Sequence, residues 1–171
     1  MKLHIGGEQY KLGWKILNIQ KKDNTDFIGD ISDLKQFKDE SIEEIYASHV
    51  LEHVKHSLLM QTFLEIFRIL KKGGKFYISV PDLSVLTNLF VSAKSADERF
   101  LVMKMMYGGQ VDEYDFHYFG WYQEILSFFL YKSGFKTYAK VENFNIFDDT
   151  SLLKFDNKFI SLNVVAFKPE T

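Results

Sequence analysis

One histidine of the chain, His117, lies in a segment of acidic and aromatic residues at positions 112–120. Histidine can take up a proton near neutral pH, because its ordinary pKa is about 6.5. A carboxylate two residues earlier, Asp115, could orient the ring. We therefore predict that His117 is a general base, positioned by Asp115, for an acceptor that must lose a proton. The alternative is that His117 caps the helix predicted to follow, or forms a hydrogen bond in the core.

A second group of chemically active side chains is formed by His49, Glu52 and His53. Spacings of three and four residues place all three on one face of a helical turn. Together with His117 they would offer three nitrogens and one oxygen, a donor set that suits a divalent transition metal. The other interpretation is that this segment is only the turn after a strand and binds no metal.

The apolar pattern of the chain predicts strands that alternate with helices to position these groups. Strands are expected over residues 3–5, 15–19, 26–30, 42–48, 75–80, 136–141 and 161–167. Helices are expected over residues 57–71, 83–92, 97–106 and 121–133. We expect Ser57 to cap the first of these helices and the glycines at 73 and 74 to end it. Such alternation is typical of an α/β fold with a largely parallel sheet and an antiparallel closing pair of strands.

The first strand runs directly into Gly6 and Gly7, and only nine residues, 6–14, precede the second strand. A parallel crossover that contains a full helix takes about a dozen residues or more, so the first crossover helix is expected to be shortened or absent. The N-terminus of that helix is where dinucleotide-binding folds hold a pyrophosphate. The short connection therefore disfavours NAD and ATP, and it favours a nucleoside cofactor without phosphates.

Composition limits the remaining possibilities. The 171 residues fit one domain, residues 1–171, and 46% of them are hydrophobic. A formal net charge of -2 with dispersed lysines and arginines argues against a nucleic-acid partner. No apolar run is long enough to predict a membrane span. The absence of cysteine excludes disulfides and thiolate metal sites and, without a predicted secretory leader, leads us to expect a cytoplasmic protein.

Several motifs in order along the chain carry a resemblance to a known family. They are LHIGG at 3–7, GDISDL at 29–34, ASHVLEH at 47–53, RILKKGG at 68–74, ISVPDL at 78–83, MMYGGQ at 105–110 and DFH at 115–117. The sequence resembles the class I S-adenosylmethionine-dependent methyltransferases, specifically a small type-11-like group found in bacterial surface-polysaccharide gene neighbourhoods. The resemblance implies a Rossmann-like sheet of seven strands, mostly parallel, with an antiparallel last strand.

The resemblance also implies which residues contact S-adenosylmethionine, all of them at the carboxyl ends of the first four strands. In chain order these are Gly6 and Gly7 beside the methionine part, Asn18 and Gln20 at the ribose, Asp30 and Ile31 at the adenine, and Ser48 and His49 at the sulfonium and the acceptor. His49 is also expected to be catalytic, together with His117 and Asp115. The chain departs from the family at Gln20, where an acid usually accepts hydrogen bonds from both ribose hydroxyls. For Asp30, a turn-capping role is an equal alternative.

The function expected from these residues is O- or N-methylation of a small acceptor, a sugar or a sugar-linked precursor of surface glycans. One alternative is a non-catalytic binding or partner protein with a weakened cofactor site. Another is a metal-dependent nucleic-acid 2′-O-methyltransferase, because His49, Glu52, His53 and His117 are similar to the metal cluster of small-RNA methyltransferases. We expect no metal, since the same Val-Leu-Glu-His turn occurs in related enzymes without one. The methionine-rich segment 100–106 is expected in the core; if exposed, it would form a lid or a homodimer surface.

Overall fold

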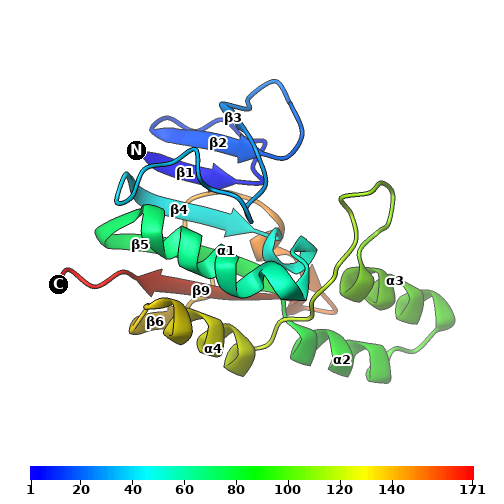
Figure 1. Ribbon diagram of the computed structural model, residues 1–171. Coiled ribbons are helices and arrows are strands. Elements are labelled where there is room, and N and C mark those ends of the chain that lie inside the picture. The colour runs from blue at the N-terminus through cyan, green and yellow to red at the C-terminus, as the bar shows by residue number, and fades with distance from the viewer.

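A seven-stranded sheet forms the centre of the computed structural model, which describes residues 1–171 (Figure 1). Its strands are β1 (Lys2–Ile5), β2 (Trp14–Asn18), β3 (Phe27–Ile28), β4 (Ile42–Ser48), β5 (Leu70–Pro81), β6 (Thr137–Lys140) and β9 (Ser161–Phe167). Their order across the sheet is β3-β2-β1-β4-β5-β9-β6. All neighbouring pairs are parallel except those of β9, which is antiparallel to both β5 and β6. The predicted fold, a mostly parallel sheet with an antiparallel last strand, is therefore confirmed.

Two of the helices cover one face of this sheet, and two others lie beyond its edge (Figure 1). The helices are α1 (His56–Ile69), α2 (Leu83–Ser92), α3 (Ala96–Tyr107) and α4 (Gln123–Ser133). Helices α1 and α4 pack side by side on the sheet, where Phe63 stacks on Phe129 at 5.5 Å between ring centroids. Helices α2 and α3 and the segment after them lie beside the edge at which β4 ends (Figure 1).

Two expectations about α1 are wrong. Its N-cap is Lys55, which makes no side-chain capping bond, so Ser57 lies inside the helix instead of capping it. The helix does not stop at the glycines either. Leu70 takes an extended conformation directly after Ile69 and pairs with Ile42, so that the chain passes from helix to sheet within one residue.

The opposite face of the sheet is covered by a loop rather than by a helix. Residues 6–13, between β1 and β2, contain no helix, as the short connection predicted. In its place Phe147, from the loop after β6, packs against Trp14 of β2 and Tyr46 of β4. Lys11 Nζ donates to the carbonyl of Ile146 at 2.7 Å and ties the two loops together. A segment far away in the sequence thus takes the place of the missing crossover helix.

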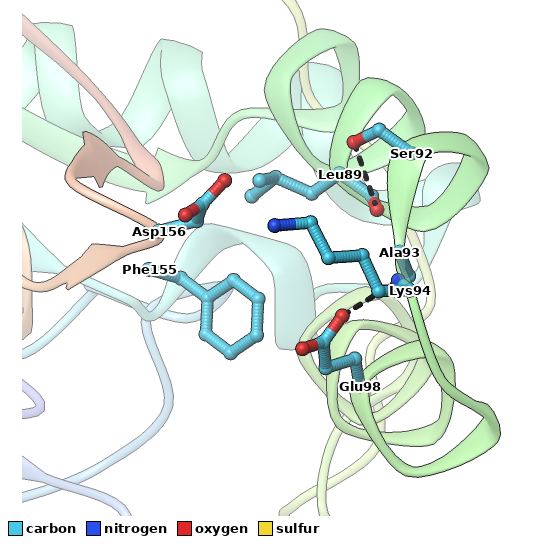
Figure 2. Close-up of a pocket in the computed structure, with 7 residues that line it drawn as sticks. All are labelled: Leu89, Ser92, Ala93, Lys94, Glu98, Phe155 and Asp156. Atoms are coloured by element: carbon cyan, nitrogen blue, oxygen red, sulfur yellow. Dashed lines mark hydrogen bonds between the residues drawn. The ribbon is translucent and has the colours of Figure 1, made fainter.

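Helices α2 and α3 pack against each other and against Ile160, and their buried residues form a small cluster separate from the main core. A short hairpin, β7 (Lys154–Phe155) and β8 (Lys158–Phe159), faces the turn between them. A cavity of about 200 Å³ lies there, and the Lys94 side chain extends between Glu98 and Asp156 (Figure 2). Phe100, Leu101 and Met103 are 57%, 48% and 38% exposed and only Val102 is buried, so the expected core position of segment 100–106 is wrong for most of it, and the lid or dimer surface stays a prediction. No helix here is both long and apolar enough to cross a membrane.

Candidate functional site

A cavity of about 730 Å³ opens at the carboxyl ends of β1, β2, β3 and β4. Ligand sites for small molecules typically measure about 300–1,000 Å³, and open α/β sheets bind ligands at this edge. One wall, which we call the strand-end wall, is formed by residues at the ends of the strands or shortly after them: Ile5, Gly6, Glu8, Asn18, Gln20, Asp30, Ile31 and His49. The other, which we call the loop wall, is formed by Val111, Asp112, Glu113, Tyr114, Asp115 and Tyr118.

The two glycines after β1 have different roles. Gly6 lines the cavity at φ +73°, a conformation that side chains rarely adopt, and a Cβ there would lie 2.5 Å from Val50 Cγ2. Gly7 does not line the cavity. A Cβ on Gly7 would instead run into the ring of His4, which is buried beneath it. The absence of side chains therefore opens the cavity at one position and makes room for a core histidine at the next.

The ends of β1 and β2 are joined through Asn18. Its Nδ2 donates to the carbonyl of Gly7 at 3.2 Å, and its Oδ1 accepts from the backbone N–H of Gln20 at 3.0 Å. With its amide group engaged in both bonds, Asn18 shapes the wall, whereas the Gln20 side chain remains on the cavity surface. Sequence reasoning missed Glu8, a carboxylate on the same wall whose Oε1 accepts from Lys22 Nζ at 2.5 Å. The only signal in the sequence that Glu8 lines the cavity is its position two residues after Gly6.

After β3 the wall is completed by Asp30 and Ile31, which both line the cavity. Asp30 Oδ1 accepts from the backbone N–H of Ser32 at 2.7 Å, so the turn-capping role considered for this residue is present. The two roles are compatible, because a carboxylate has a second oxygen for a ligand. Ile31 is only 5% exposed and packs in the main core, so it supplies a fixed apolar surface.

After β4 the chain turns sharply at His49, which has φ +53° and lines the cavity. Ser161 Oγ donates its single proton to the carbonyl of Thr150 at 3.1 Å, so its contact with His49 Nε2 at 2.8 Å must be donated by the histidine. His49 Nδ1 lies 3.3 Å from Glu52 Oε1. Nε2 is therefore bound to Ser161, and Nδ1 faces the carboxylate of Glu52. Ser48 does not line the cavity, and its hydroxyl is buried without a hydrogen-bond partner.

Glu52 is a buried carboxylate at the back of the site. It is 1% exposed, and neither of its oxygens has a hydrogen-bond partner. Burial raises the pKa of Glu52, but the close contact with His49 and the positive charge that the other histidines can carry lower it, and the net shift is downward. The carboxylate is thus ionised at neutral pH, which is unusual for a group so thoroughly removed from water.

Two further histidines surround this carboxylate, with ring centroids 4.8 Å apart. His53 lines the cavity, and its Nδ1 lies 3.1 Å from the carbonyl of Phe116. His117 lies behind the loop wall rather than on it. Burial lowers the pKa of His117, and the charge of Glu52 opposes this shift only in part. One donor atom from each of Glu52, His53 and His117 can be chosen so that all lie within 4.8 Å of one another.

The loop wall depends on backbone contacts of the segment between α3 and α4. The N–H of Tyr118 donates to the carbonyl of Glu52 at 2.8 Å, and the N–H of His117 donates to the carbonyl of Tyr107 at 3.1 Å. Asp115 faces the cavity, and its Oδ2 accepts from the N–H of Val111 at 3.3 Å. The structure therefore brings Asp115 to the cavity surface and His117 into the cluster behind it.

A family model described as a methyltransferase domain matches residues 12–78. Three solved structures cover most of this chain. A SAM-dependent methyltransferase from Archaeoglobus fulgidus is 16% identical with a TM-score of 0.58, over 97% of this chain and 85% of that one. A second from Methanosarcina mazei is 16% identical with a TM-score of 0.57, over 98% and 91%. The YcgJ protein from Bacillus subtilis is 13% identical with a TM-score of 0.60, over 99% and 92%.

The fold is that of the class I methyltransferases. None of the curated proteins compared with the chain matches it. The match over residues 12–78, which includes β2 to β4, together with this fold supports a SAM-dependent methyltransferase with S-adenosylmethionine as its cofactor. The cavity fits that cofactor in its size, in the glycine that opens it and in the carboxylates on the strand-end wall. The roles predicted for individual residues stay predictions.

Proposed function

We propose that the protein transfers a methyl group from S-adenosylmethionine to a hydroxyl group of a sugar or sugar-linked precursor of surface glycans. The observation that carries this proposal is that one cavity joins the strand-end wall to a loop wall of carboxylates and tyrosines. The first wall has the position and residue types of a nucleoside site. The second has groups that recognise a polyhydroxylated molecule.

On the strand-end wall, Gly6 lets the cofactor approach the backbone, and Asp30 with Ile31 holds the adenine. We assign the ribose hydroxyls to Glu8. Its carboxylate is charged and accepts stronger hydrogen bonds from them than the neutral amide of Gln20 can. When bound here, S-adenosylmethionine supplies a methyl group on a positively charged sulfur, which leaves as a neutral thioether. The chain's own contribution is to hold the acceptor oxygen in line with that methyl group.

On the loop wall, the rings of Tyr114 and Tyr118 are 40% and 51% exposed and offer flat surfaces for a sugar ring. Carboxylates outnumber lysines around the cavity: the acids are Glu8, Asp30, Asp112, Glu113 and Asp115, and the lysines are Lys22 and Lys55. An acidic lining accepts hydrogen bonds from sugar hydroxyls and repels phosphate groups. A neutral sugar group therefore fits this wall better than a nucleic acid does.

The proposed reaction needs one proton removed. Asp115 is the carboxylate that faces the acceptor, and we assign it the proton of the hydroxyl. The acceptor oxygen then forms a bond to the methyl carbon, the carbon–sulfur bond breaks with its electron pair on sulfur, and Asp115 releases the proton to solvent. His49 positions Glu52 through the 3.3 Å contact. His117 does not line the cavity, so it acts on the acceptor indirectly, through its contact with Glu52 and His53 behind the loop wall.

Two measurements test the proposal. Titration calorimetry with S-adenosylhomocysteine should show binding at micromolar concentrations with one site per chain, and no binding at millimolar concentrations would overturn it. Incubation with methyl-labelled S-adenosylmethionine and a panel of free sugars and neutral glycosides should transfer label to at least one acceptor. Cofactor binding without transfer to any panel member would favour the non-catalytic binding protein. Transfer only to RNA would favour the nucleic-acid alternative.

A further inference from the structure

We propose that Glu52, His53 and His117 form a binding site for a divalent transition metal ion at the back of the cavity. One donor atom from each of the three residues can be chosen so that all lie within 4.8 Å of one another. They come from two distant parts of the chain, the 3-10 turn η1 (Leu51–His53) after β4 and the segment after α3. The site stands on these side chains alone, whereas its role in catalysis rests on the proposed function.

The donor atoms of Glu52 and His117 have no other partner. Both carboxylate oxygens of Glu52 and Nδ1 of His117 are shielded from solvent and make no hydrogen bond. Glu52 is 1% exposed, so water cannot satisfy its charge. Native proteins rarely leave buried polar atoms unpaired, because each loses its hydrogen bonds to water without replacement. A bound cation would satisfy one oxygen of Glu52 and Nδ1 of His117 at once and balance the charge of the carboxylate.

A hydrogen bond to the backbone determines which ring nitrogen of the third ligand, His53, is free for an ion. The carbonyl oxygen of Phe116 can only accept, so Nδ1 of His53 carries the proton in their 3.1 Å contact. Neutral imidazole then keeps its lone pair on Nε2, the nitrogen that remains for an ion. Histidine ligands of metals are commonly oriented in this way, by a hydrogen bond from the other ring nitrogen to a backbone carbonyl.

His49 is not one of the proposed metal ligands. Its Nε2 is bound to Ser161 Oγ, and its Nδ1 lies 3.3 Å from Glu52 Oε1. His49 therefore orients the carboxylate that holds the ion. An ion about 2.1 Å from each ligand in tetrahedral arrangement would hold the ligand atoms roughly 3.4 Å apart. The three side chains would close by no more than about 1.4 Å from the 4.8 Å limit of their present spacing.

Two imidazole nitrogens and one carboxylate oxygen select the class of metal. This set suits Mn²⁺, Fe²⁺, Co²⁺, Ni²⁺ or Zn²⁺, whereas Mg²⁺ and Ca²⁺ prefer sites made of oxygen atoms. Three protein ligands leave positions on the ion free, and His53 brings the site to the cavity surface. An acceptor hydroxyl bound to one of these positions would lose its proton more readily, because the ion stabilises the alkoxide. Asp115 on the same surface would then receive that proton.

Titration of the purified full chain with Co²⁺, without cofactor or acceptor, tests the site. We expect one equivalent of Co²⁺ to bind and to produce visible absorption. Glu52→Gln, His53→Ala and His117→Ala should each weaken this binding more than about 100-fold. His49→Ala removes only an outer contact and should weaken it roughly 10–100-fold. His56→Ala is the matched control, because His56 is exposed and stacks on Phe119 outside the cluster.

Saturable binding that the three ligand variants leave unchanged, or that His56→Ala weakens as much, would overturn the proposal, as would the absence of saturable binding. A crystal of the unmodified chain grown with Mn²⁺ gives a test without any variant. Anomalous scattering should place the ion within bonding distance of Glu52, His53 and His117, and an ion only elsewhere would contradict the site. Because neither measurement contains S-adenosylmethionine, a failed metal site and a failed methyltransferase assignment remain distinguishable.

Discussion

The two walls of the cavity are held in place by different kinds of contact. On the strand-end wall, backbone bonds from Gly6 to Leu17 at 2.8 Å and from Gly29 to Asn18 at 3.0 Å extend the sheet pairing into the loops. The segment that forms the loop wall lies between α3 and α4 and is bound to the body at a few points, where the N–H groups of Tyr118 and Phe119 donate to the carbonyl of Glu52 and His53 contacts the carbonyl of Phe116. Loops on a rigid scaffold can vary without loss of the fold. The comparison therefore predicts that cofactor binding depends on the first wall and acceptor chemistry on the second.

The largest effect is expected from His117→Ala, which should lower the rate of methyl transfer and leave cofactor binding unchanged. Binding of S-adenosylhomocysteine should stay within about two-fold, because His117 lies outside the cavity lining. The rate of methyl transfer, measured with the best acceptor of the sugar panel, should fall about 10²–10⁴-fold, because the variant removes one of the three proposed ligands of the ion that helps the acceptor lose its proton. His56→Ala is the control for loss of an imidazole. A parallel loss of cofactor binding would show that the walls do not act separately.

The next effect is expected on the strand-end wall, from Gly6→Ala. A Cβ at this position would lie 2.5 Å from Val50 Cγ2, so that either the loop or the start of η1 must move into the cavity. We expect S-adenosylhomocysteine affinity to fall at least about 100-fold in calorimetry, which corresponds to about 2.7 kcal/mol.

Gly13→Ala is the matched control for that variant. Gly13 has φ +85°, so alanine meets the same backbone strain there, but its Cβ would have no atom within 4 Å. Its affinity should stay within about three-fold of the unchanged protein. If both variants lose binding equally, backbone strain rather than the contact with Val50 is responsible, and the steric argument for Gly6 fails.

The contrast between the walls also explains what the sequence could predict. The strand-end positions follow from the order of short apolar segments, so Gly6, Asn18 and Asp30 could be assigned to one cavity before its geometry was known. The limits of α2 and β9 agree with the predicted residues, because apolar periodicity and clear boundaries coincide there. Glu8 was missed, because a charged residue in a loop carries no periodic pattern.

The features that could not be predicted depend on contacts between distant residues. Gln9 donates to the carbonyl of Asp148, 139 residues away, where the loop replaces a crossover helix. The glycines after α1 resemble a helix stop, but pairing of Leu70 with Ile42 extends the chain before they are reached. Likewise, the spacings of Glu52 and His53 from His49 indicated a shared face, whereas the position of His117 beside Glu52 and His53 depends on the fold of the whole loop wall.

A pH-dependent effect on stability is expected at His4, beneath the strand-end wall. Burial lowers its pKa from 6.5 to about 4, an effect that the charge of Asp149 opposes only in part. Between about pH 4 and pH 6.5 the unfolded chain binds more protons than the folded chain. The stabilising effect of neutral His4 is therefore fully present above about pH 6.5 and is lost as the pH falls toward 4. At pH 5 the loss is about 2 kcal/mol relative to pH 7.

Chemical denaturation at several pH values checks this expectation. His4→Phe keeps a ring against Phe147, where the two centroids now lie 4.1 Å apart, and removes the titrating group. The free energy of unfolding should then depend less on pH between 5 and 7. His56→Ala should keep the full dependence, because it removes an exposed histidine. An unchanged slope in His4→Phe would assign the pH dependence to other groups.

The smallest effect is expected at Gln20, where the strand-end wall departs from the methyltransferases that the sequence resembles. If Glu8 binds the ribose hydroxyls, Glu8→Gln should weaken S-adenosylhomocysteine binding about 10-fold, because a hydrogen bond to a charged group becomes a neutral one. Gln20→Asp should then change affinity less than about three-fold, since a carboxylate already lines that part of the cavity. The opposite result, a sharp gain in Gln20→Asp with no loss in Glu8→Gln, would mean that this half of the cavity lacks its carboxylate. It would also favour the binding protein with a weakened cofactor site over the enzyme.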